Sequence, residues 1–533
     1  MPEVAVYINI VSAGVPNRQD KPKIIEGVKT MKKVLAIVIC MTLVLSLCIS
    51  ANAITSVKKP STSKHVKLTW MMHGSSVKDD KAVMTKVNAL LKKKLNCELE
   101  MKWEGWGTYD QKQTLALNGG APIDIYFTCS WTANTYQATA KKGAFVRLDD
   151  PKNNLFASCA PNLFKTLPQV LAQAAMTDGK KGKGIYAIPT YKEIAQQYNW
   201  LFNKRILDKY KIDASQIKDL KGLEPLLKKI KDGEGKDFYP INCDYTVWMR
   251  ALTNTDQMEN KLLVGYAFNP INPSKSAKSF FNRNASPEYK AYCETMHKYY
   301  KAGYVNPAAI ANNQVMSETW QNTRASGQWA FDIFPYVPGD ENSLTDQYNY
   351  KFTVKPVQAG FVSTTSARGA MNAVSVTSKN PDRAVMLLNL INTDPELRTL
   401  LAYGVEGVHY TKDDGRIVMK PNNGFSPWVY GMANVNILPL KDSDPADKYT
   451  RMFPKFNRAE GLPILGYAPD FEPIKTQMAT LNNLADQYNT GLVTGASDPA
   501  TVLPEFNKKL KDGGIDVVIK ELNKQLNAFL TAK

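Results

Sequence analysis

Histidine is scarce in this chain, and the short motifs of several common enzyme classes are missing. The 533 residues include four histidines. His65 lies in or beside a polar linker, and His73, His297 and His409 show no metal-ligand spacing among them. An H-E-x-x-H zinc motif, a G-x-S-x-G nucleophile elbow and a P-loop are all absent. The sequence therefore predicts no metal, no cofactor and no catalytic residues.

Cysteine usage excludes two further classes. The chain has seven cysteines, and those beyond residue 53 are odd in number, with long and irregular spacing. No C-x-x-C pair occurs, so neither a zinc cluster of that kind nor a disulfide-dense framework is expected. We expect most of these thiols to be small core residues; they are Cys97, Cys129, Cys159, Cys243 and Cys293.

Long hydrophobic runs are also rare, and the one clear example stands near the beginning. Two lysines precede a run from Val34 to Leu47, and Ala51-Asn52-Ala53 follows it. That order is typical of a secretory signal peptide, whereas a membrane span needs about 20 apolar residues. We predict a signal peptide over residues 31–53, cleaved after Ala53, and a secreted protein. The alternatives are a lipoprotein anchored at Cys48 and a single-pass membrane anchor.

The segment before Met31 has no features of a targeting signal. Residues 26–30 can be encoded by a purine-rich stretch that resembles a bacterial ribosome-binding site. We therefore interpret residues 1–30 as an upstream extension outside the translated protein, with Met31 as the true start.

Positive charge is in excess but is not concentrated in one arm. The formal net charge is +18. Residues 1–53 hold six Lys/Arg and three Asp/Glu, so the chain from residue 54 carries 18 − 6 + 3 = +15. An exported chain without a recognisable nucleic-acid module is not expected to bind nucleic acid. A diffuse positive field could favour an anionic cell wall or an acidic ligand.

Strand and helix patterns alternate after a polar linker at residues 54–64. Alternating strands and helices predict a doubly wound parallel sheet, with ligands beyond the carboxyl ends of its strands. About 480 residues exceed what one hydrophobic core holds, so we expect two or more lobes. The predicted strands are 66–71, 97–103, 123–127, 198–202, 328–334 and 370–376, and the predicted helices are 81–96, 110–117, 224–231, 287–301, 383–391 and a closing helix over 515–529.

Five segments occur in an order that resembles a known family. They read "GGAPIDIYF" (119–127), "GKGIYAIPTYKEIAQQYNWLFNKRIL" (182–207), "ASGQWAFDIF" (325–334), "KNPDRAVMLLNLINTD" (379–394) and "YGVEGVHY" (403–410). Together they resemble extracellular solute-binding proteins of ABC importers, in the maltose-binding-like group. The tail, with "LGYAPDFEPIK" (465–475), resembles a C-terminal domain of uncharacterised function from a Gram-positive branch of that family.

The resemblance implies a two-lobed α/β periplasmic-binding-protein fold of type II. Each lobe would be a doubly wound sheet flanked by helices, and a helical extension would end the chain. By analogy, lobe 1 covers 65–192 and 357–402, and lobe 2 covers 193–356 and 403–533. The implied function is capture of a carbohydrate, an oligosaccharide by expectation, between the lobes and its delivery to a membrane permease. We expect a monomer with no cofactor.

A sugar site needs flat aromatic faces with polar groups at their edges. The resemblance implies a ligand-binding glutamate just after Pro189, which is Glu193 here. It also places Trp131 and Tyr336 after strands, as a stacking residue and a lobe 2 aromatic. Trp103, Glu104 and Trp106 follow a predicted strand, and Tyr191 and Arg368 lie near the crossings between lobes. Two further tryptophans complete the candidates, although a large lobe also buries such residues in its core; they are Trp248 and Trp428. For Arg368 an exposed loop position is the other interpretation.

Two other function classes remain open at this point. A glycosidase needs only two carboxylates, which Glu104 and Glu193 could supply. A wall-associated binding protein would exploit the positive charge, and salt would weaken its binding.

Overall fold

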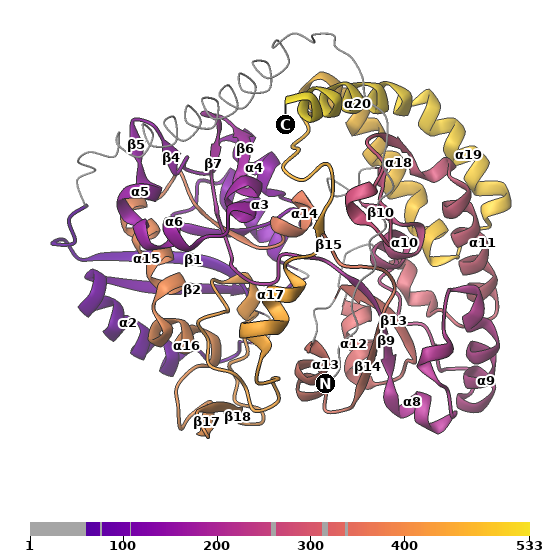
Figure 1. The fold of residues 1–533 in the computed structure, drawn as a ribbon, viewed down its shortest axis with the longest axis horizontal. Helices are drawn as coiled ribbons and strands as arrows, with labels where there is room; N and C mark the ends of the chain where they lie inside the picture. The colour runs from indigo at the N-terminus through magenta and orange to yellow at the C-terminus, as the bar shows by residue number, and fades with distance from the viewer. Residues whose placement is uncertain are drawn as a thin grey trace, which may run out of the picture. The chain divides into compact units, whose positions relative to one another are not determined.

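The computed structural model describes residues 60–74, 77–106, 108–256, 263–311, 318–335 and 339–532 (Figure 1). The predicted signal peptide, the segment before it and Tyr336 lie outside the described residues. Within them, no helix is long and apolar enough to cross a membrane.

The first sheet contains the three predicted strands of the N-terminal region, the strand predicted at 370–376, and one short strand that was not predicted, β8. Its order is β2-β1-β3-β16-β8. The bounds are β1 Val66–His73, β2 Cys97–Glu104, β3 Ile125–Thr128, β8 Ile188–Pro189 and β16 Met371–Val374. β1 pairs with β2 and β3 in parallel, and β16 runs antiparallel to its neighbours. The parallel part matches the alternation of strands and helices in the sequence.

Helices surround this sheet and explain its apolar strands. All four residues of β3 are buried, as expected for a strand covered on both faces. In α2, Val83, Val87 and Leu91 are buried on one face, which is the amphipathic stripe the sequence predicted. The helices of this part are α2 Lys81–Leu95, α3 Tyr109–Asn118, α4 Tyr136–Lys142, α5 Leu155–Cys159, α6 Pro161–Thr166, α7 Gln169–Ala175, α14 Thr364–Ala367, α15 Pro381–Thr393 and α16 Pro395–Tyr403.

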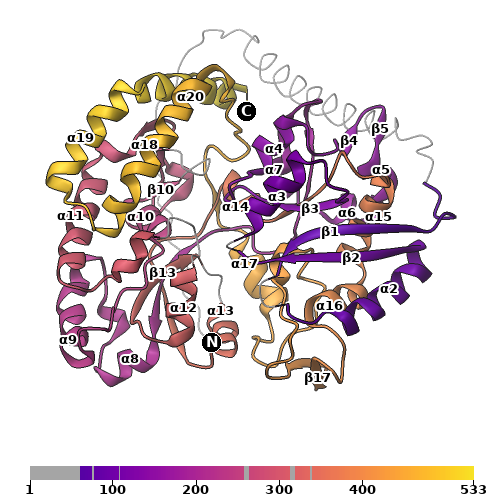
Figure 2. The same ribbon diagram turned by 180° about the vertical axis from the view of Figure 1, so that it is seen from behind.

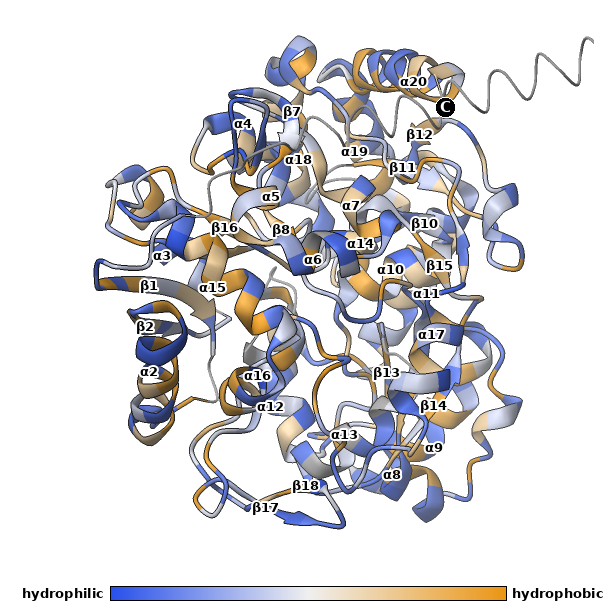
Figure 3. Ribbon diagram, turned by 60° about the vertical axis from the view of Figure 1, so that its left-hand side comes forward, coloured by the Kyte–Doolittle hydropathy of each residue, from blue (hydrophilic) through white to orange (hydrophobic). Residues whose placement is uncertain are grey.

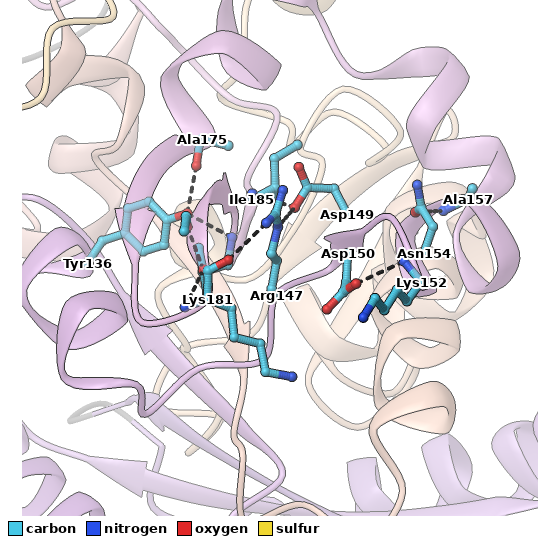
Figure 4. Close-up of polar contacts among 12 residues, drawn as sticks. Tyr136, Arg147, Asp149, Asp150, Lys152, Asn154, Ala157, Ala175, Lys181 and Ile185 are labelled. Atoms are coloured by element: carbon cyan, nitrogen blue, oxygen red, sulfur yellow. Dashed lines mark hydrogen bonds and ion pairs between the residues drawn. The ribbon is translucent and has the colours of Figure 1, made fainter. Parts of the chain in front are cut away.

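A polar framework ties the surface hairpins of this first part to its core (Figure 4). The hairpins are β4 Asp149–Asp150 with β5 Asn153–Asn154, and β6 Met176–Gly179 with β7 Gly182–Ile185. The buried hydroxyl of Tyr136 donates to the Ala175 carbonyl at 2.6 Å. Arg147 donates to Asp149 at 3.0 Å and to the Lys181 carbonyl at 2.9 Å.

The second sheet differs from the parallel sheet that we predicted. Its described strands have the order β13-β9-β14, with bounds β9 Tyr198–Asn203, β13 Phe331–Pro335 and β14 Phe352–Pro356, and both pairings are antiparallel. Beside this sheet, the described residues show parallel pairing as isolated bridges from Ile241 to Val305 and to Phe331. The two sheets nevertheless share one feature. β9 and β16 are each the first strand after the chain passes from one core to the other, and each runs antiparallel to the strand beside it.

Helices fill the rest of the second part and the C-terminal region. α18, α19 and α20 lie together in Figures 1 and 2, and α18 also contacts α11. In α20, Ile515, Val518, Leu522 and Leu526 are buried, and Figure 3 shows both hydrophobic and hydrophilic residues along this helix. The bounds are α8 Lys204–Lys209, α9 Glu224–Glu234, α10 Tyr245–Thr253, α11 Pro287–Lys301, α12 Glu318–Ser326, α13 Asp340–Tyr348, α18 Lys475–Thr494, α19 Pro499–Asp512 and α20 Ile515–Ala532, with a small sheet of β10 Thr255–Asp256, β11 Val264–Ala267 and β12 Phe280–Asn282.

The chain passes between the two cores along three neighbouring segments. Gln196 bridges to Phe361, and β15 (Phe361–Val362) pairs in parallel with β19 (Glu460–Gly461). The exact lobe boundaries stay a prediction. Phe425, Met432 and Ala433, from a stretch that we had assigned to lobe 2, are buried in the first core, whereas Leu462 and the helices after it belong to the second.

A third, smaller cluster of buried residues lies between residues 402 and 453. It includes the hairpin of β17 (Tyr410–Asp413) and β18 (Arg416–Met419), and α17 (Phe453–Phe456) follows it in the chain. Asp414 and Gly415 have φ of 44° and 74°, which is the left-handed turn conformation that Asp-Gly favours in a two-residue hairpin. The cysteines Cys97, Cys129, Cys159, Cys243 and Cys293 are free and buried, as predicted.

Candidate functional site

A cavity of about 470 Å³ is lined by residues of both cores and of the crossing segments. This volume lies in the range of small-molecule binding sites. Its lining divides into a first wall, a middle at residues 192–198, and a second wall from α10, α12, α13 and the end of β13. The first wall consists of residues that follow β1, β2 and β3 and of the segments 365–369 and 426–430.

Three tryptophans form most of the aromatic surface of the first wall. The ring centroid of Trp106 lies 5.3 Å from that of Trp131 and 5.1 Å from that of Trp428. The indole N–H of Trp131 donates to the Gly369 carbonyl at 2.7 Å, which fixes the orientation of that ring. Such rings offer flat apolar faces to the C–H groups of a sugar.

His73, at the end of β1, supports Trp106 from behind. The two rings are stacked, with centroids 3.8 Å apart and planes inclined by 19°. The side chain is 2% exposed. Burial lowers the pKa of His73 to about 3, and the nearby backbone of Glu104 only partly opposes this shift. The imidazole is therefore neutral at physiological pH and packs as an aromatic ring.

The loop that carries Trp428 is held by buried polar side chains. Arg398 donates to the Val429 carbonyl at 2.6 Å and to the Asn434 carbonyl at 3.0 Å. Asn372 of β16 donates to the Met432 carbonyl at 2.8 Å. Any side chain at Gly431 would collide with Trp428. The ring therefore has a fixed position on the first wall.

Glu193 lies in the middle of the cavity lining, on the first crossing segment. Its Oε1 pairs with Nζ of Lys192. Its Oε2 is buried and has no hydrogen-bond partner among the described residues. Buried carboxylate oxygens normally have partners, so this oxygen is an acceptor that no donor among the described residues satisfies.

Asn457 holds the backbone on both sides of Glu193. Its Oδ1 accepts from the backbone N–H of Ile194 at 2.7 Å, and its Nδ2 donates to the carbonyl of Lys192 at 3.2 Å. Asn457 follows α17, so a segment far along the chain sets the direction of the Glu193 side chain.

The second wall combines an aromatic pair with charge. The rings of Trp320 and Phe334 are stacked, with centroids 5.0 Å apart and planes inclined by 27°. The guanidinium of Arg324 lies 3.8 Å from the ring centroid of Trp320, within the range of a cation–π contact. All three residues line the cavity, together with Arg250, Tyr348 and the side-chain amides of Gln321 and Gln347.

Four of the predicted site residues line the cavity: Glu193, Trp131, Trp106 and Trp428. Two of the others are close in sequence but point elsewhere. Trp103 donates to Asp80 at 2.8 Å and packs against Phe425. Glu104 forms an ion pair with Lys112.

Two more predicted residues, Trp248 and Tyr191, lie outside the lining. Trp248 is fully buried in the second core and donates to Asp332 at 3.0 Å. Tyr191 packs partly buried against the first core, and its backbone carbonyl accepts from Val435. Both side chains pack within the protein, as is common for the large rings of tryptophan and tyrosine. Neither is part of the cavity surface.

Arg368 also differs from both of its sequence interpretations. It is 4% exposed and donates to the carbonyls of Ala174 and Met176 at 2.6 and 2.8 Å. The space around it is about 10 Å³, enough for a single water. Arg368 is therefore buried and lies outside the lining of the 470 Å³ cavity.

Sequence reasoning missed most of the second wall. Trp320 and Arg324 are four residues apart and therefore share one face of α12, a spacing that could have singled them out. Phe334 and Asp332 are two residues apart in β13 and therefore lie on the same face of the strand; both contact Trp320, Phe334 by ring stacking and Asp332 by a hydrogen bond. Phe334 stood inside a quoted motif, but nothing in its local pattern distinguished it from a core residue.

Within the described ranges, no group of three or more His, Cys, Asp or Glu side chains is placed to hold a metal ion. Among the described residues that line the cavity, Glu193 is the one carboxylate.

Comparison with known proteins identifies relatives over most of the chain. Residues 463–531 match "Domain of unknown function (DUF3502)". The chain is 28% identical over 461 residues to a carbohydrate ABC transporter substrate-binding protein of Streptococcus pneumoniae serotype 4, covering 85% of this chain and 88% of that protein.

Solved structures give the same result. The N-glycan transport solute binding protein (NgtS) from Streptococcus pneumoniae, in complex with Man1GlcNAc, superposes with a TM-score of 0.75 and 25% identity, covering 87% of this chain and all of that one. Its complex with Man5GlcNAc gives 0.73 and 26%, covering 88% and 99%. The predicted resemblance to solute-binding proteins of ABC importers and the two-lobed fold are both confirmed.

Proposed function

We propose that this protein is the extracytoplasmic substrate-binding receptor of an ABC importer, and that it captures an oligosaccharide in the cavity between the two walls. The observation that carries the proposal is the pairing of aromatic surfaces on both walls with the unpartnered Oε2 of Glu193. Rings on opposite sides can cover both faces of a sugar, and the carboxylate can accept from its hydroxyls. A membrane permease would be the partner that receives the ligand, and the receptor would act as a monomer.

A glycan of mannose and N-acetylglucosamine is the ligand class that we propose first. NgtS, which resembles this chain over nearly its whole length, is solved with Man1GlcNAc and Man5GlcNAc. The second wall here offers amides and guanidinium groups, which donate hydrogen bonds to hydroxyl and acetamido oxygens.

We propose that the site binds without catalysis. A glycosidase of the usual kind needs two carboxyl groups facing one glycosidic bond. Glu104, the predicted second member, pairs with Lys112 and is absent from the cavity lining. This geometry supports a receptor rather than a hydrolase.

The location outside the cytoplasm follows from the N-terminal pattern and stays a proposal. A signal peptide over residues 31–53 would be removed after Ala53, or the chain would be retained by a lipid at Cys48. The mass of the exported protein distinguishes the two.

The direct test is thermal unfolding of residues 54–533, freed of ligand, with Man1GlcNAc, Man5GlcNAc, maltotriose and a uronic-acid oligosaccharide. At 100 times its Kd a ligand adds about 2.7 kcal/mol to the free energy of unfolding. A shift with one sugar class supports the proposal, and no shift with any of them contradicts it. Binding to anionic wall polymer that disappears at high salt would instead favour the wall-associated alternative, because exposed charges are screened over about 10 Å at 0.1 M salt.

A further inference from the structure

Asp332 lies directly behind the second wall, out of reach of the cavity. It sits in β13, is 0% exposed and is absent from the cavity lining. The neighbouring positions Phe334 and Pro335 line the cavity. A buried charge in such a place needs several partners.

The partners of Asp332 include two side chains of the cavity surface. Its Oδ2 pairs with Nη2 of Arg324 at 2.5 Å and accepts from the indole N–H of Trp320 at 3.0 Å. Its Oδ1 accepts from the indole N–H of Trp248 at 3.0 Å. One carboxylate therefore fixes a cation and a ring that face the ligand, and anchors both to a tryptophan of the core.

The arrangement restricts both wall residues in position. Trp320 and Arg324 lie four residues apart on α12, and the guanidinium also rests on the Trp320 ring. Ring and cation thus share one oxygen as a common acceptor. Without that acceptor, the indole N–H of Trp320 would lose its bond to Asp332, and the buried guanidinium of Arg324 would lose the counter-charge that Asp332 supplies.

We propose that Asp332 is a positioning residue for the second wall: it contacts no ligand, and it sets the affinity of the cavity by fixing the orientation of Trp320 and Arg324. The affinity part of this inference rests on the proposed function. The positioning part does not, and can be measured without any ligand.

The protonation of Asp332 offers a second way to test the positioning claim. Burial raises the pKa of Asp332 to about 6, although the charge of Arg324 and the N–H of Trp248 oppose the shift. The other titratable groups that face it are Asp244 and Cys243, before α10, and Tyr348 of α13. Protonation near pH 6 removes the charge that holds Arg324, so the second wall should loosen in mild acid.

The chain offers a matched control for removing this charge. Lys448 and Asp444 form another ion pair with the same exposures, 2% and 0%, as Arg324 and Asp332. Neither Lys448 nor Asp444 lines the cavity. Asp444→Asn therefore breaks an equally buried pair without touching the wall.

The first experiment follows the indole N–H signals of residues 54–533 by ¹H–¹⁵N NMR, assigned with Trp320→Phe, Trp248→Phe and Trp131→Phe. We expect the Trp320 and Trp248 signals to move with pH near 6 and to shift in Asp332→Asn. The Trp131 signal, bonded to Gly369, should stay in place. If the Trp320 signal changes neither with pH nor in Asp332→Asn, the positioning claim is overturned.

The second experiment measures the Kd for Man5GlcNAc by calorimetry. We expect Asp332→Asn to raise the Kd at least about tenfold, as removal of orienting residues does at other sites, and Asp444→Asn to leave it within about twofold, the range of distant substitutions. Trp320→Phe keeps an aromatic ring, although a smaller one, and removes the N–H that bonds to Asp332, so it tests the claim if Asp332→Asn fails to fold; an unchanged Kd in that variant overturns the claim. If the unaltered protein binds none of the sugars, the proposed function fails, and the NMR result still decides the positioning claim.

Discussion

The two walls of the cavity reach a similar aromatic surface by different physical means. On the first wall, Trp106 rests on the neutral ring of His73, and packing holds the cluster. On the second wall, Trp320 is tied to a carboxylate that also pairs with Arg324. Burial favours the neutral form of the titratable group in both places, but the consequences are opposite. His73 is already neutral at physiological pH, whereas Asp332 becomes neutral only in acid.

This difference predicts that the second wall responds to mild acid and that the first wall does not. Dispersion and apolar burial change little with mild acid or salt, so the first wall should be insensitive to both. A carboxylate that holds a buried cation loses that role when it is protonated. The substitutions below test this contrast.

Removal of a first-wall ring should have the largest effect. Trp106→Ala deletes the ring between His73, Trp131 and Trp428, and we expect it to weaken oligosaccharide binding by about 2 kcal/mol or more, roughly 30-fold or more in Kd. Trp103→Phe is the control, because Trp103 lies three positions away and is not in the lining. Calorimetry with Man5GlcNAc measures both. An equal loss of affinity in the two variants would mean that the substitutions disturb folding rather than the binding surface.

Glu193→Gln should come next in size. The substitution keeps the shape, removes a charged acceptor and leaves Lys192 without its partner. Hydrogen bonds to charged groups contribute about 1.5–3 kcal/mol, so we expect the Kd to rise at least about tenfold. Glu104→Gln, which removes a carboxylate paired with Lys112, should bind as the unaltered protein does. The opposite ranking would place the ligand nearer to Glu104.

The pH dependence of stability should separate the two walls with opposite signs. The pKa of His73 is lowered to about 3 in the folded state, so its contribution is present above its ordinary pKa of 6.5 and is lost as pH falls towards 3. The pKa of Asp332 is raised from 3.8 to about 6, so its contribution is present below 3.8 and is lost as pH rises through 6. Each changes the free energy of unfolding by about 1.4 kcal/mol per pH unit.

Urea unfolding between pH 4 and 6 checks these signs. Relative to the unaltered protein, His73→Phe should gain stability as pH falls, and Asp332→Asn should lose it. Parallel curves for all three proteins would mean that neither group shifts its pKa on folding.

Asn457→Ala should give the smallest effect. It removes the two hydrogen bonds that hold the backbone around Glu193, and a typical hydrogen bond contributes about 1 kcal/mol. We expect a Kd a few-fold higher in the unaltered background and no further change in a Glu193→Gln background. Additive effects in the double variant would show that Asn457 does not act through Glu193.

Much of the fold could be predicted because its signals are local. The stripe of Val83, Val87 and Leu91 and the alternation in β2 are visible over a few residues. The closing helix showed the same kind of stripe. The pairing direction of β9 has no local signal in the sequence, because it depends on where the chain enters the second sheet after the crossing.

The site was predicted unevenly for the same reason. Trp106 and Trp131 follow strands of the first sheet, so the rule that ligands lie beyond strand ends found them. Trp103, Glu104 and Trp248 have the same residue types, and only tertiary packing turns them away from the cavity. The pairing of Trp320 and Arg324 with Asp332 depends on the packing of α12 against β13, which no short pattern in either segment indicates.

The central claim is that an oligosaccharide binds between these two walls. The most direct measurement is calorimetric titration of ligand-free residues 54–533 with Man5GlcNAc, repeated with Trp106→Ala and with Trp320→Ala. The account predicts saturable one-site binding that each substitution weakens, because each removes an aromatic face from one side of the same ligand. Binding that neither substitution changes, or no binding to this glycan or to any other oligosaccharide of the panel, would contradict it.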